Sequence, residues 1–340
     1  MRLQGRKGKL SAHLTKLQKR LCNELQDGLP ICARPYDDLA RYLGSDEETV
    51  FGEVRQLKEA GIIRRIGALI DYGAIGLRST LVAVHVPEEH VKEVAEAVNS
   101  LREVSHNYRR AHHFNLWFTL QGESDEHIQE TLLELSERFD IDFHSLPVKR
   151  VFKLDVRFDA ESEGQEVGDV QEEGTKVKSK KVKGKIRLDE DEKLILARVQ
   201  GDLRLASKPF EFLCREGLAE QAVLGIIQGL VDKGVIRRIA AVVDHRKLGF
   251  VANVLFCSEV PEEKVVAAGQ KLARFGMVSH CYERETFEGW PYNLFAMMHA
   301  RSMGEIQHVI NRFVEAEGID SFELLATAAE LKKKPVRYRF

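Results

Sequence analysis

Ile63-Arg64-Arg65-Ile66-Gly67-Ala68 is the stretch that decides the architecture, because it returns almost unchanged as Ile236-Arg237-Arg238-Ile239-Ala240-Ala241. The offset between the two copies is 173 residues. Further matches keep that spacing to within one residue: Asp71 with Asp244, Gly76 with Gly249, and Ser105-His106-x-Tyr108-x-Arg110 with Ser279-His280-x-Tyr282-x-Arg284. A fixed offset over this length is the mark of a tandem duplication, so we expect two similar units in one chain.

The composition is that of a globular protein without an overall electrostatic bias. The 340 residues are 44% apolar and 31% charged, and 51 basic against 53 acidic side chains give a net charge of −2. Such a chain has no global basic field to attract nucleic acid or an anionic membrane. The five cysteines form no C-x-x-C pair, and no run of about 18 apolar residues occurs. We therefore predict a cytoplasmic protein with reduced thiols and no membrane span.

Each unit is expected to begin with a winged helix-turn-helix, in the order helix, short helix, helix and strand. Apolar residues at helical spacing mark the first and third helices of the first copy, Leu14, Leu17, Leu21 and Leu25, then Val50, Val54 and Leu57. Ser45 and Glu48 have the spacing of a capping box, which predicts a helix start near residue 46. In the second copy Val223, Ile226, Ile227 and Leu230 mark the equivalent third helix.

The rest of each unit is expected to form a ferredoxin-like βαββαβ module, because period-2 and period-3.6 apolar runs alternate in that order. The fold class is therefore α+β, a tandem duplication of winged helix-turn-helix plus ferredoxin-like module. Residues 159–187 contain no aromatic side chain and segregate their charges, which predicts a flexible linker. The predicted boundaries are 10–71 and 72–158 for the first copy, 159–187 for the linker, and 188–244 and 245–340 for the second copy.

The helix-turn-helix segments first suggest a DNA-binding regulator, but their charge argues against it. Residues 46–60 hold five acids against Arg55 and Lys58, and residues 217–233 hold two acids against Lys233. The totals are −3 and −1, whereas a recognition helix must bring cations to the phosphates. We expect these helices to serve as packing elements or as walls for the neighbouring module.

Two groups of polar residues carry the chemistry. On a strand, residues two apart share a face, so His106, Tyr108 and Arg110 project together, and so do their counterparts in 280–284. Arginine binds a carboxylate through two parallel hydrogen bonds, and histidine and tyrosine transfer protons. This combination, present twice, predicts a site for a polycarboxylate. The alternative is that these side chains are ordinary cross-strand pairs on a half-exposed sheet.

A winged helix followed by this module resembles the Lrp/AsnC family over essentially all of both halves. More specifically, His-Asn-Tyr-x-Arg-x-His-x-Phe-Asn-Leu-Trp-Phe-Thr, starting at His106, resembles one subunit of the siroheme decarboxylases. His-Cys-Tyr-x-Arg from His280, followed by Trp-Pro-Tyr-Asn-Leu-Phe-x-Met-x-His from Trp290, resembles the other subunit. The chain therefore resembles a natural fusion of the two subunits, related also to the enzymes of heme d1 synthesis.

The resemblance implies that two acetate side chains of siroheme lose carbon dioxide, which gives 12,18-didecarboxysiroheme on a route to heme or heme d1. It implies no cofactor, since the iron arrives in the substrate. Carried over by position, the catalytic residues are His280, Arg284, His106 and Arg110. The substrate-binding residues are Tyr108, His112, Asn115, Tyr282, Trp290, Tyr292, Asn293 and His299, to which we add Arg65 and Arg238 from the repeated strands.

Several alternatives stay open at this point. His280 or His106 is either a proton donor or an axial ligand of the substrate iron, and either both halves are catalytic or one of them is degenerate. The halves should pair within the chain as subunits do in a dimer, with a further homo-oligomer as a second level of assembly. The competing functions are an Lrp/AsnC-type transcription regulator and a tetrapyrrole-binding protein without turnover.

Overall fold

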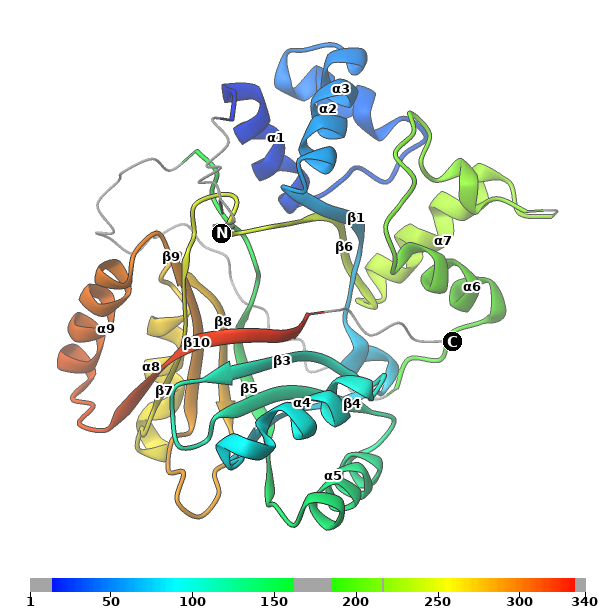
Figure 1. Ribbon diagram of the computed structural model, residues 1–340. Coiled ribbons are helices and arrows are strands. Elements are labelled where there is room, and N and C mark those ends of the chain that lie inside the picture. The colour runs from blue at the N-terminus through cyan, green and yellow to red at the C-terminus, as the bar shows by residue number, and fades with distance from the viewer. Residues whose placement is uncertain (1–13, 162–184, 216, 334–340) are drawn as a thin grey trace, which may run out of the picture.

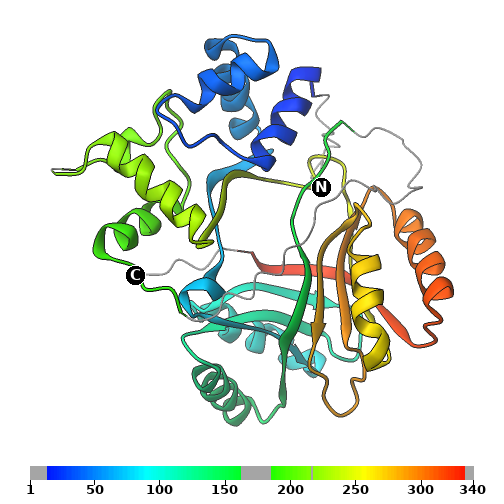
Figure 2. The same ribbon diagram turned by 180° about the vertical axis from the view of Figure 1, so that it is seen from behind.

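The computed structural model describes residues 14–161, 185–215 and 217–333. It has an upper part, built from helices around strands β1 and β6, and a lower part, a β-barrel with helices on its outside (Figures 1 and 2). Each half of the sequence contributes to both parts. The predicted linker 159–187 lies outside the described residues from 162 to 184.

The elements of the two copies follow the expected order. The first copy consists of α1 Lys16–Asp27, α2 Pro35–Leu43, α3 Glu47–Glu59, β1 Ile63–Ile70, the short 3₁₀ helix η1 Tyr72–Ile75, β2 Arg78–Val84, η2 Glu88–His90, α4 Val91–Ser100, β3 Val104–Arg110, β4 Leu116–Gly122, α5 Asp125–Phe139 and β5 Phe143–Leu154. The second copy consists of α6 Glu190–Val199, η3 Glu211–Leu213, α7 Glu220–Asp232, β6 Ile236–Val243, β7 Ala252–Ser258, α8 Glu262–Leu272, β8 Val278–Arg284, β9 Leu294–Ala300, α9 Met303–Glu317 and β10 Phe322–Lys333.

Two details of the helical parts differ from the sequence prediction. The cap of α3 is Asp46, whose side chain accepts a hydrogen bond from the backbone nitrogen of Thr49, so the predicted Ser45–Glu48 capping box is wrong. Aspartate is as good a cap as serine, and the helix starts one residue later. In the second copy the middle helix is reduced to the single turn η3.

The upper part joins both copies through the repeated strands. Strand β1 pairs antiparallel with β6, with Ile66 opposite Ala241. Their apolar side chains belong to one hydrophobic core that includes Leu21, Val54 and Ile227 from the helices of both copies. The helical parts therefore pack on each other inside the chain, as we expected of elements that support a neighbouring module.

The lower part is a closed eight-stranded barrel in the order β10-β3-β4-β2-β5-β8-β9-β7. Each half supplies four neighbouring strands in the order of a ferredoxin-like sheet. The long strands β5 and β10 close the barrel, because β5 pairs with β2 of its own half and β8 of the other, and β10 pairs with β7 and β3. This confirms the predicted fold class and the pairing of the two halves within one chain.

Alternation along the strands separates the outside of the barrel from its inside. Helices α4 and α5 cover the outer face of one half, and α8 and α9 cover that of the other (Figures 1 and 2). The inner face carries its own apolar cluster, which includes Trp117, Leu146, Trp290, Phe295 and Leu325. This cluster fills one end of the barrel, and the polar residues of β3 and β8 lie above it.

Gly269 lies where the outer helix α8 packs against β5, so a larger residue there shows how tight this packing is. A Cβ atom added there would lie 2.3 Å from the ring of Phe152 on β5, so Gly269→Ala should lower the free energy of unfolding by about 1–3 kcal/mol. Gly225 on α7 is the control, because nothing lies within 4 Å of its added Cβ and alanine favours helix there. Urea unfolding of both variants is the measurement. Equal stability of Gly269→Ala and the parent would contradict the packing.

Candidate functional site

The two predicted polar triplets face each other inside the barrel. Strands β3 and β8 lie four places apart among the eight strands, hence on opposite walls. Tyr108 is opposite Trp117 and Tyr282 is opposite Phe295, both members of the inner cluster. Their neighbours two residues away therefore also project inward. Along each strand the arginine is deepest, the tyrosine comes next and the histidine lies nearest the open mouth.

Arg110 and Arg284 are two guanidinium groups held deep in the barrel. Nη1 of Arg284 donates to the carbonyl of Leu146 at 2.7 Å, and Nη1 of Arg110 donates to the equivalent carbonyl of Leu325. Each arginine also lies over the tyrosine of its own triplet, at 5.6 Å for Arg110 and 4.8 Å for Arg284. Burial lowers the pKa of both arginines to about 10.

Neither of these arginines forms an ion pair with an acidic side chain in the described parts of the chain, and the Nε atom of each is buried without a hydrogen-bond partner. A buried cation without a counter-charge is costly, because it has lost its hydration. Two such cations on facing walls are suited to bind an anionic ligand that carries more than one carboxylate.

The two histidines of the triplets are neutral at physiological pH. Burial and the nearby Lys333 lower the pKa of His106 to about 4, and burial and Arg237 lower that of His280 to about 3. Each Nδ1 lies 2.9 Å from the hydroxyl of the preceding serine, Ser105 or Ser279.

The tautomer of His280 follows from its serine. The hydroxyl of Ser279 donates its one proton to the carbonyl of Met297 at 3.2 Å, so it must accept from Nδ1 of His280. This assignment leaves Nε2 of His280 with a free lone pair. Such a nitrogen is suited to ligate iron or to accept a proton.

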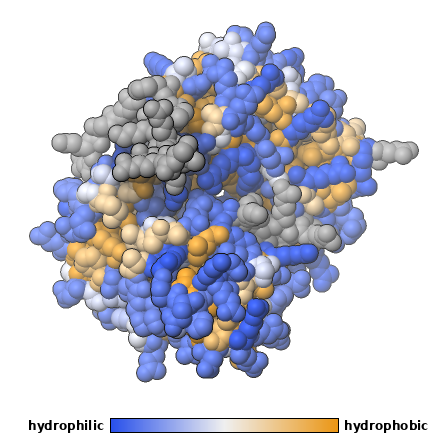
Figure 3. Space-filling model, in the orientation of Figure 1, coloured by the Kyte–Doolittle hydropathy of each residue, from blue (hydrophilic) through white to orange (hydrophobic). Residues whose placement is uncertain are grey.

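Two arginines lie at the mouth of the barrel, where the upper and lower parts meet. Arg237 of β6 donates to the carbonyl of Leu154 at 2.9 Å and is close enough to His280 to lower its pKa. Arg64 of β1 pairs with Asp244, with Nη2 and Oδ2 2.8 Å apart. The face drawn in Figure 3 is hollowed near its centre, at this junction, and hydrophilic surface borders the hollow.

A second pair of histidines lies beside the mouth. His299 projects inward from β9, two residues beyond Met297, and its ring centroid is 5.1 Å from that of His245. Phe158 contacts both rings, at 5.3 Å from His245 and 5.1 Å from His299. Burial is the main cause that lowers the pKa of His245 to about 4 and that of His299 to about 3.

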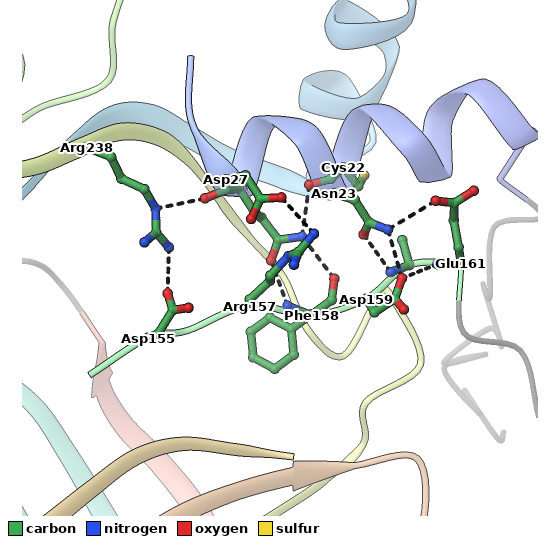
Figure 4. Close-up of polar contacts among 11 residues, drawn as sticks. Cys22, Asn23, Asp27, Asp155, Arg157, Phe158, Asp159, Glu161 and Arg238 are labelled. Atoms are coloured by element: carbon green, nitrogen blue, oxygen red, sulfur yellow. Dashed lines mark hydrogen bonds and ion pairs between the residues drawn. The ribbon is translucent and has the colours of Figure 1, made fainter. Parts of the chain in front are cut away.

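Phe158 lies in a segment that follows β5 and runs along α1, and side chains of α1 fix its position (Figure 4). The side chain of Gln26 donates to the carbonyl of Phe158 and accepts from its backbone nitrogen, both at 2.9 Å. The side-chain amide of Asn23 donates to the carboxylate of Asp159 at 2.8 Å, and its Oδ1 accepts from the backbone nitrogen of Ala160 at 2.9 Å. The ring of Phe158 points away from α1, toward the barrel (Figure 4).

Several predicted site residues lie away from this mouth. Asn115 and Asn293 each bond both ways to the backbone of one residue, Val86 or Val260, which fixes the start of β4 and of β9. Trp290 is 1% exposed in the inner apolar cluster, with Tyr292 against its edge at 4.7 Å. His112 is at the same far end of the barrel, 5.5 Å from Trp290.

The repeated strands also orient their arginines differently from the prediction. Arg65 donates to the carbonyl of Gln200 at 3.2 Å, and Arg238 donates to the carbonyl of Gln26 and pairs with Asp155 at 2.7 Å. These contacts tie the upper part together and connect it to the end of β5 (Figure 4). The neighbouring arginines, Arg64 and Arg237, are the ones placed toward the triplets.

Sequence reasoning did not include His245, Phe158, Arg64 or Arg237 among the candidate site residues. A signal for His245 existed in the repeat itself, because the residue after the repeated aspartate is Tyr72 in one copy and histidine in the other. A difference between copies at a buried position marks a place where their roles diverge. Phe158 gave no such signal, since it lies at the edge of the predicted linker.

The buried pair His245 and His299 predicts a loss of stability in mild acid. In the unfolded chain histidine takes up a proton near its ordinary pKa of 6.5, but these two folded histidines stay neutral down to about 4 and 3. The free energy of unfolding should therefore fall as the pH drops below 6.5, by up to about 1.4 kcal/mol per pH unit for each histidine. Urea unfolding at several pH values measures this slope. His245→Phe should reduce it, and an unchanged slope would contradict the assignment.

Comparison with known proteins agrees with this fold. The AsnC-like ligand binding domain matches residues 74–153 and again 247–332, and the siroheme decarboxylase NirDL-like HTH domain matches residues 18–64. Fold and domain matches thus define a protein of two fused AsnC-like units that close one barrel. The siroheme decarboxylase of Hydrogenobacter thermophilus is 35% identical over 92% of both chains. This chain therefore belongs to the siroheme decarboxylase family.

Two further comparisons concern its organisation. The siroheme decarboxylase NirD subunit of Stutzerimonas stutzeri is 39% identical, and the match covers 43% of this chain and 95% of that subunit. One half of the chain thus corresponds to a whole subunit, which confirms the predicted fusion. The crystal structure of the siroheme decarboxylase NirDL in complex with an iron-uroporphyrin III analogue has a TM-score of 0.72 and 31% identity, and it covers 95% of each chain.

Proposed function

We propose that this chain is an enzyme that decarboxylates siroheme, and that it converts two acetate side chains of the macrocycle into methyl groups. One observation carries the proposal: Arg110 and Arg284 are buried on facing walls of the barrel and have no acidic partner among the described residues, below a mouth where Arg64 and Arg237 lie. A flat macrocycle that bears several carboxylates supplies the missing counter-charges. Relatives that match the whole chain are siroheme decarboxylases, which supports the same substrate.

The chemistry required of the protein is orientation and proton transfer. Arg110 and Arg284 each hold a carboxylate through parallel hydrogen bonds, which fixes the direction in which the bond to carbon dioxide breaks. The electron pair left on the methylene carbon is delocalised into the macrocycle, and a proton then adds to that carbon. No electrons are gained or lost overall, so the proposal includes no cofactor beyond the iron of the substrate.

His280 is proposed as the axial ligand of the substrate iron. Its Nε2 has a free lone pair, its side chain projects into the barrel, and its neutral state persists at physiological pH. The tyrosines of the two triplets line the path between histidine and arginine, and burial raises the pKa of each to about 12, so both keep their hydroxyl protons as donors.

The proposal also covers location and assembly. All five cysteines are free thiols, which suits a reducing cytoplasm. Over the part of the chain that the structure describes, no helix is both long and apolar enough to span a membrane. Since the barrel already unites two subunit-like halves, one chain holds the complete set of site residues.

Anaerobic incubation with siroheme, followed by mass spectrometry of the tetrapyrrole, tests the function. The expected product has lost two carboxyl groups. Recovery of intact siroheme from a tight complex would overturn the proposal and indicate a carrier. Promoter DNA titrated at low salt tests the regulator hypothesis, and we expect no salt-sensitive binding because α3 and α7 carry few cations.

A further inference from the structure

The two walls of the barrel that carry the triplets are completed by different strands. Strand β10 pairs with β3 on the first wall, and β5 pairs with β8 on the second. Each pairing contains two irregularities at matching places, and each irregularity adds one residue to the longer strand. For that reason the positions opposite the triplets are three residues apart along β5 and β10, although the triplet residues are two apart along β3 and β8.

The positions opposite the two triplets differ in polarity. Beside its arginine, tyrosine and histidine, in that order, the first wall has Thr327, Glu330 and Lys333. At the same three places the second wall has Val148, Val151 and Leu154. Residues directly opposite each other on neighbouring strands project to the same side of a sheet, so these side chains face the interior as the triplets do. One wall is therefore polar and charged beside its triplet, and the other is apolar.

Lys333 and Glu330 form an ion pair on the first wall. Nζ of Lys333 lies 3.5 Å from Oε2 of Glu330, and the two side chains are 25% and 24% exposed. Burial is the main cause that lowers the pKa of His106, and of the two charges Lys333 adds to this shift while Glu330 opposes it. A partly exposed ion pair contributes little to stability, so stability does not explain why charges stand where the other wall is apolar.

A second departure from the repeat places a further cation on the same side. Arg246 follows β6 at the place where the first copy has Gly73. Burial raises the pKa of the Tyr108 phenol to about 12, and Arg246 is close enough to oppose that rise. Arg246 and Lys333 come from separate segments, and the residues at the equivalent places, Gly73 and Leu154, are uncharged. Positive charge is thus concentrated beside the first triplet.

The triplets themselves do not distinguish the two walls, since arginine, tyrosine and histidine stand in the same order on both. A macrocycle with one carboxylate at each arginine can therefore enter in two orientations, which exchange its edges between the walls. Selection of one orientation requires a difference between the walls, through an attractive or a repulsive contact. The charged residues Glu330 and Lys333 and their apolar counterparts provide such a difference.

We propose that Lys333 binds a carboxylate of the tetrapyrrole that the reaction retains, and that the contrast between the charged and the apolar wall fixes which edge of the macrocycle faces which wall. This inference rests on the proposed function. Siroheme carries more carboxylates than the two it loses, so carboxylates remain for cations other than the two deep arginines. An ammonium group binds such a carboxylate as a point charge.

The order of charges on each wall defines what it accepts. On the first wall Glu330 lies between the cations Arg110 and Lys333, so it repels a carboxylate from the middle position and keeps the two bound carboxylates apart. On the second wall Val151 and Leu154 present apolar surface above the arginine. Two of the rings of siroheme carry an added methyl group, and this edge of the macrocycle suits the apolar wall.

Lys333→Met keeps the length of the side chain and removes its charge. Siroheme titrated into this variant under conditions that prevent turnover, and followed by absorbance, should bind about tenfold more weakly than to the parent, because one charge-assisted contact is lost. Lys271→Met is the matched control, since Lys271 pairs with Glu317 on the outer helices, and it should bind as the parent does. Parent-like affinity of Lys333→Met would overturn the assignment of Lys333.

The double variant Lys333→Met, Leu154→Lys moves the cation to the other wall and tests the orientation. Products of a time course with siroheme, assigned by mass spectrometry and by NMR after removal of the iron, show which acetates are lost and which is lost first. We expect one isomer at each stage from the parent, a mixture of singly decarboxylated isomers from Lys333→Met, and a different main isomer from the double variant. The parent's isomers from both variants would overturn the fixed orientation.

The two readouts separate this inference from the proposed function. If the parent binds siroheme and releases it unchanged, the proposed function fails, while weaker binding by Lys333→Met still supports the contact with a carboxylate. If the parent turns siroheme over and Lys333→Met matches Lys271→Met in both readouts, the inference fails and the function stands. Thermal unfolding without tetrapyrrole should give Lys333→Met the midpoint of the parent, because its ion pair is partly exposed.

Discussion

Replacing Arg284 by methionine is expected to lower kcat/KM for siroheme about 10²–10³-fold, the loss found when one preorganised charged donor is removed from a water-poor site. The guanidinium is buried beside Tyr282 and Phe295 and has no acidic partner in the described chain, so its charge is available to a substrate carboxylate. Steady-state turnover with siroheme measures the effect. Arg109→Met is the control, because Arg109 pairs with Glu88 outside the barrel.

The same substitution should leave the free protein at least as stable as the parent. Without tetrapyrrole, Arg284 is a desolvated charge that contacts the carbonyl of Leu146 and the rings of Tyr282 and Phe295, and methionine fills similar volume without the cost of burying a charge. Thermal unfolding of the two proteins without tetrapyrrole is the measurement. Loss of activity together with a large drop in the unfolding midpoint would show that Arg284 is a structural residue and not a carboxylate anchor.

His280→Gln is expected to lower the decarboxylation rate by at least about 10²-fold, because glutamine has no ring nitrogen to offer to the iron or to a proton. The absorbance spectrum of bound siroheme should change in this variant, since the proposed axial ligand is lost. The exposed His90→Gln is the matched control and should have the parent's spectrum and rate. If the His280→Gln variant keeps the parent's spectrum, His280 is not the axial ligand of the iron, whatever the decarboxylation rate of the variant.

The sequence predicted the duplication, the order of elements and the shared face of each triplet, because these follow from local patterns. The repeat of residues 63–68 located the strands, and two-residue alternation placed His106, Tyr108 and Arg110 on one face. Alternation alone does not say which face of a strand is inside. For that reason the sequence pointed to Arg65 and Arg238 as substrate ligands, whereas in the structure they bond to the upper part of the molecule. Their neighbours Arg64 and Arg237 lie toward the site instead.

What escaped prediction depends on contacts between distant segments. A chain of hydrogen bonds joins Arg110 to His299 through Thr327 and Asn253, which are neutral side chains with no motif of their own and which meet only when β10 closes the barrel. Asn115 and Asn293 matched the family motif but bond to the backbone, so their occurrence in the motif reflects the shape of the hairpin. A motif therefore identifies positions that matter without saying whether they contact substrate.

Spectroscopic titration of siroheme, under conditions that prevent turnover, into the parent protein and into the double variant Arg110→Met, Arg284→Met tests the central claim most directly. We predict saturable binding to the parent and an affinity at least about tenfold weaker for the double variant, because both buried counter-charges for the carboxylates are gone. Equal affinity of the two proteins would contradict the assignment of these arginines to the substrate.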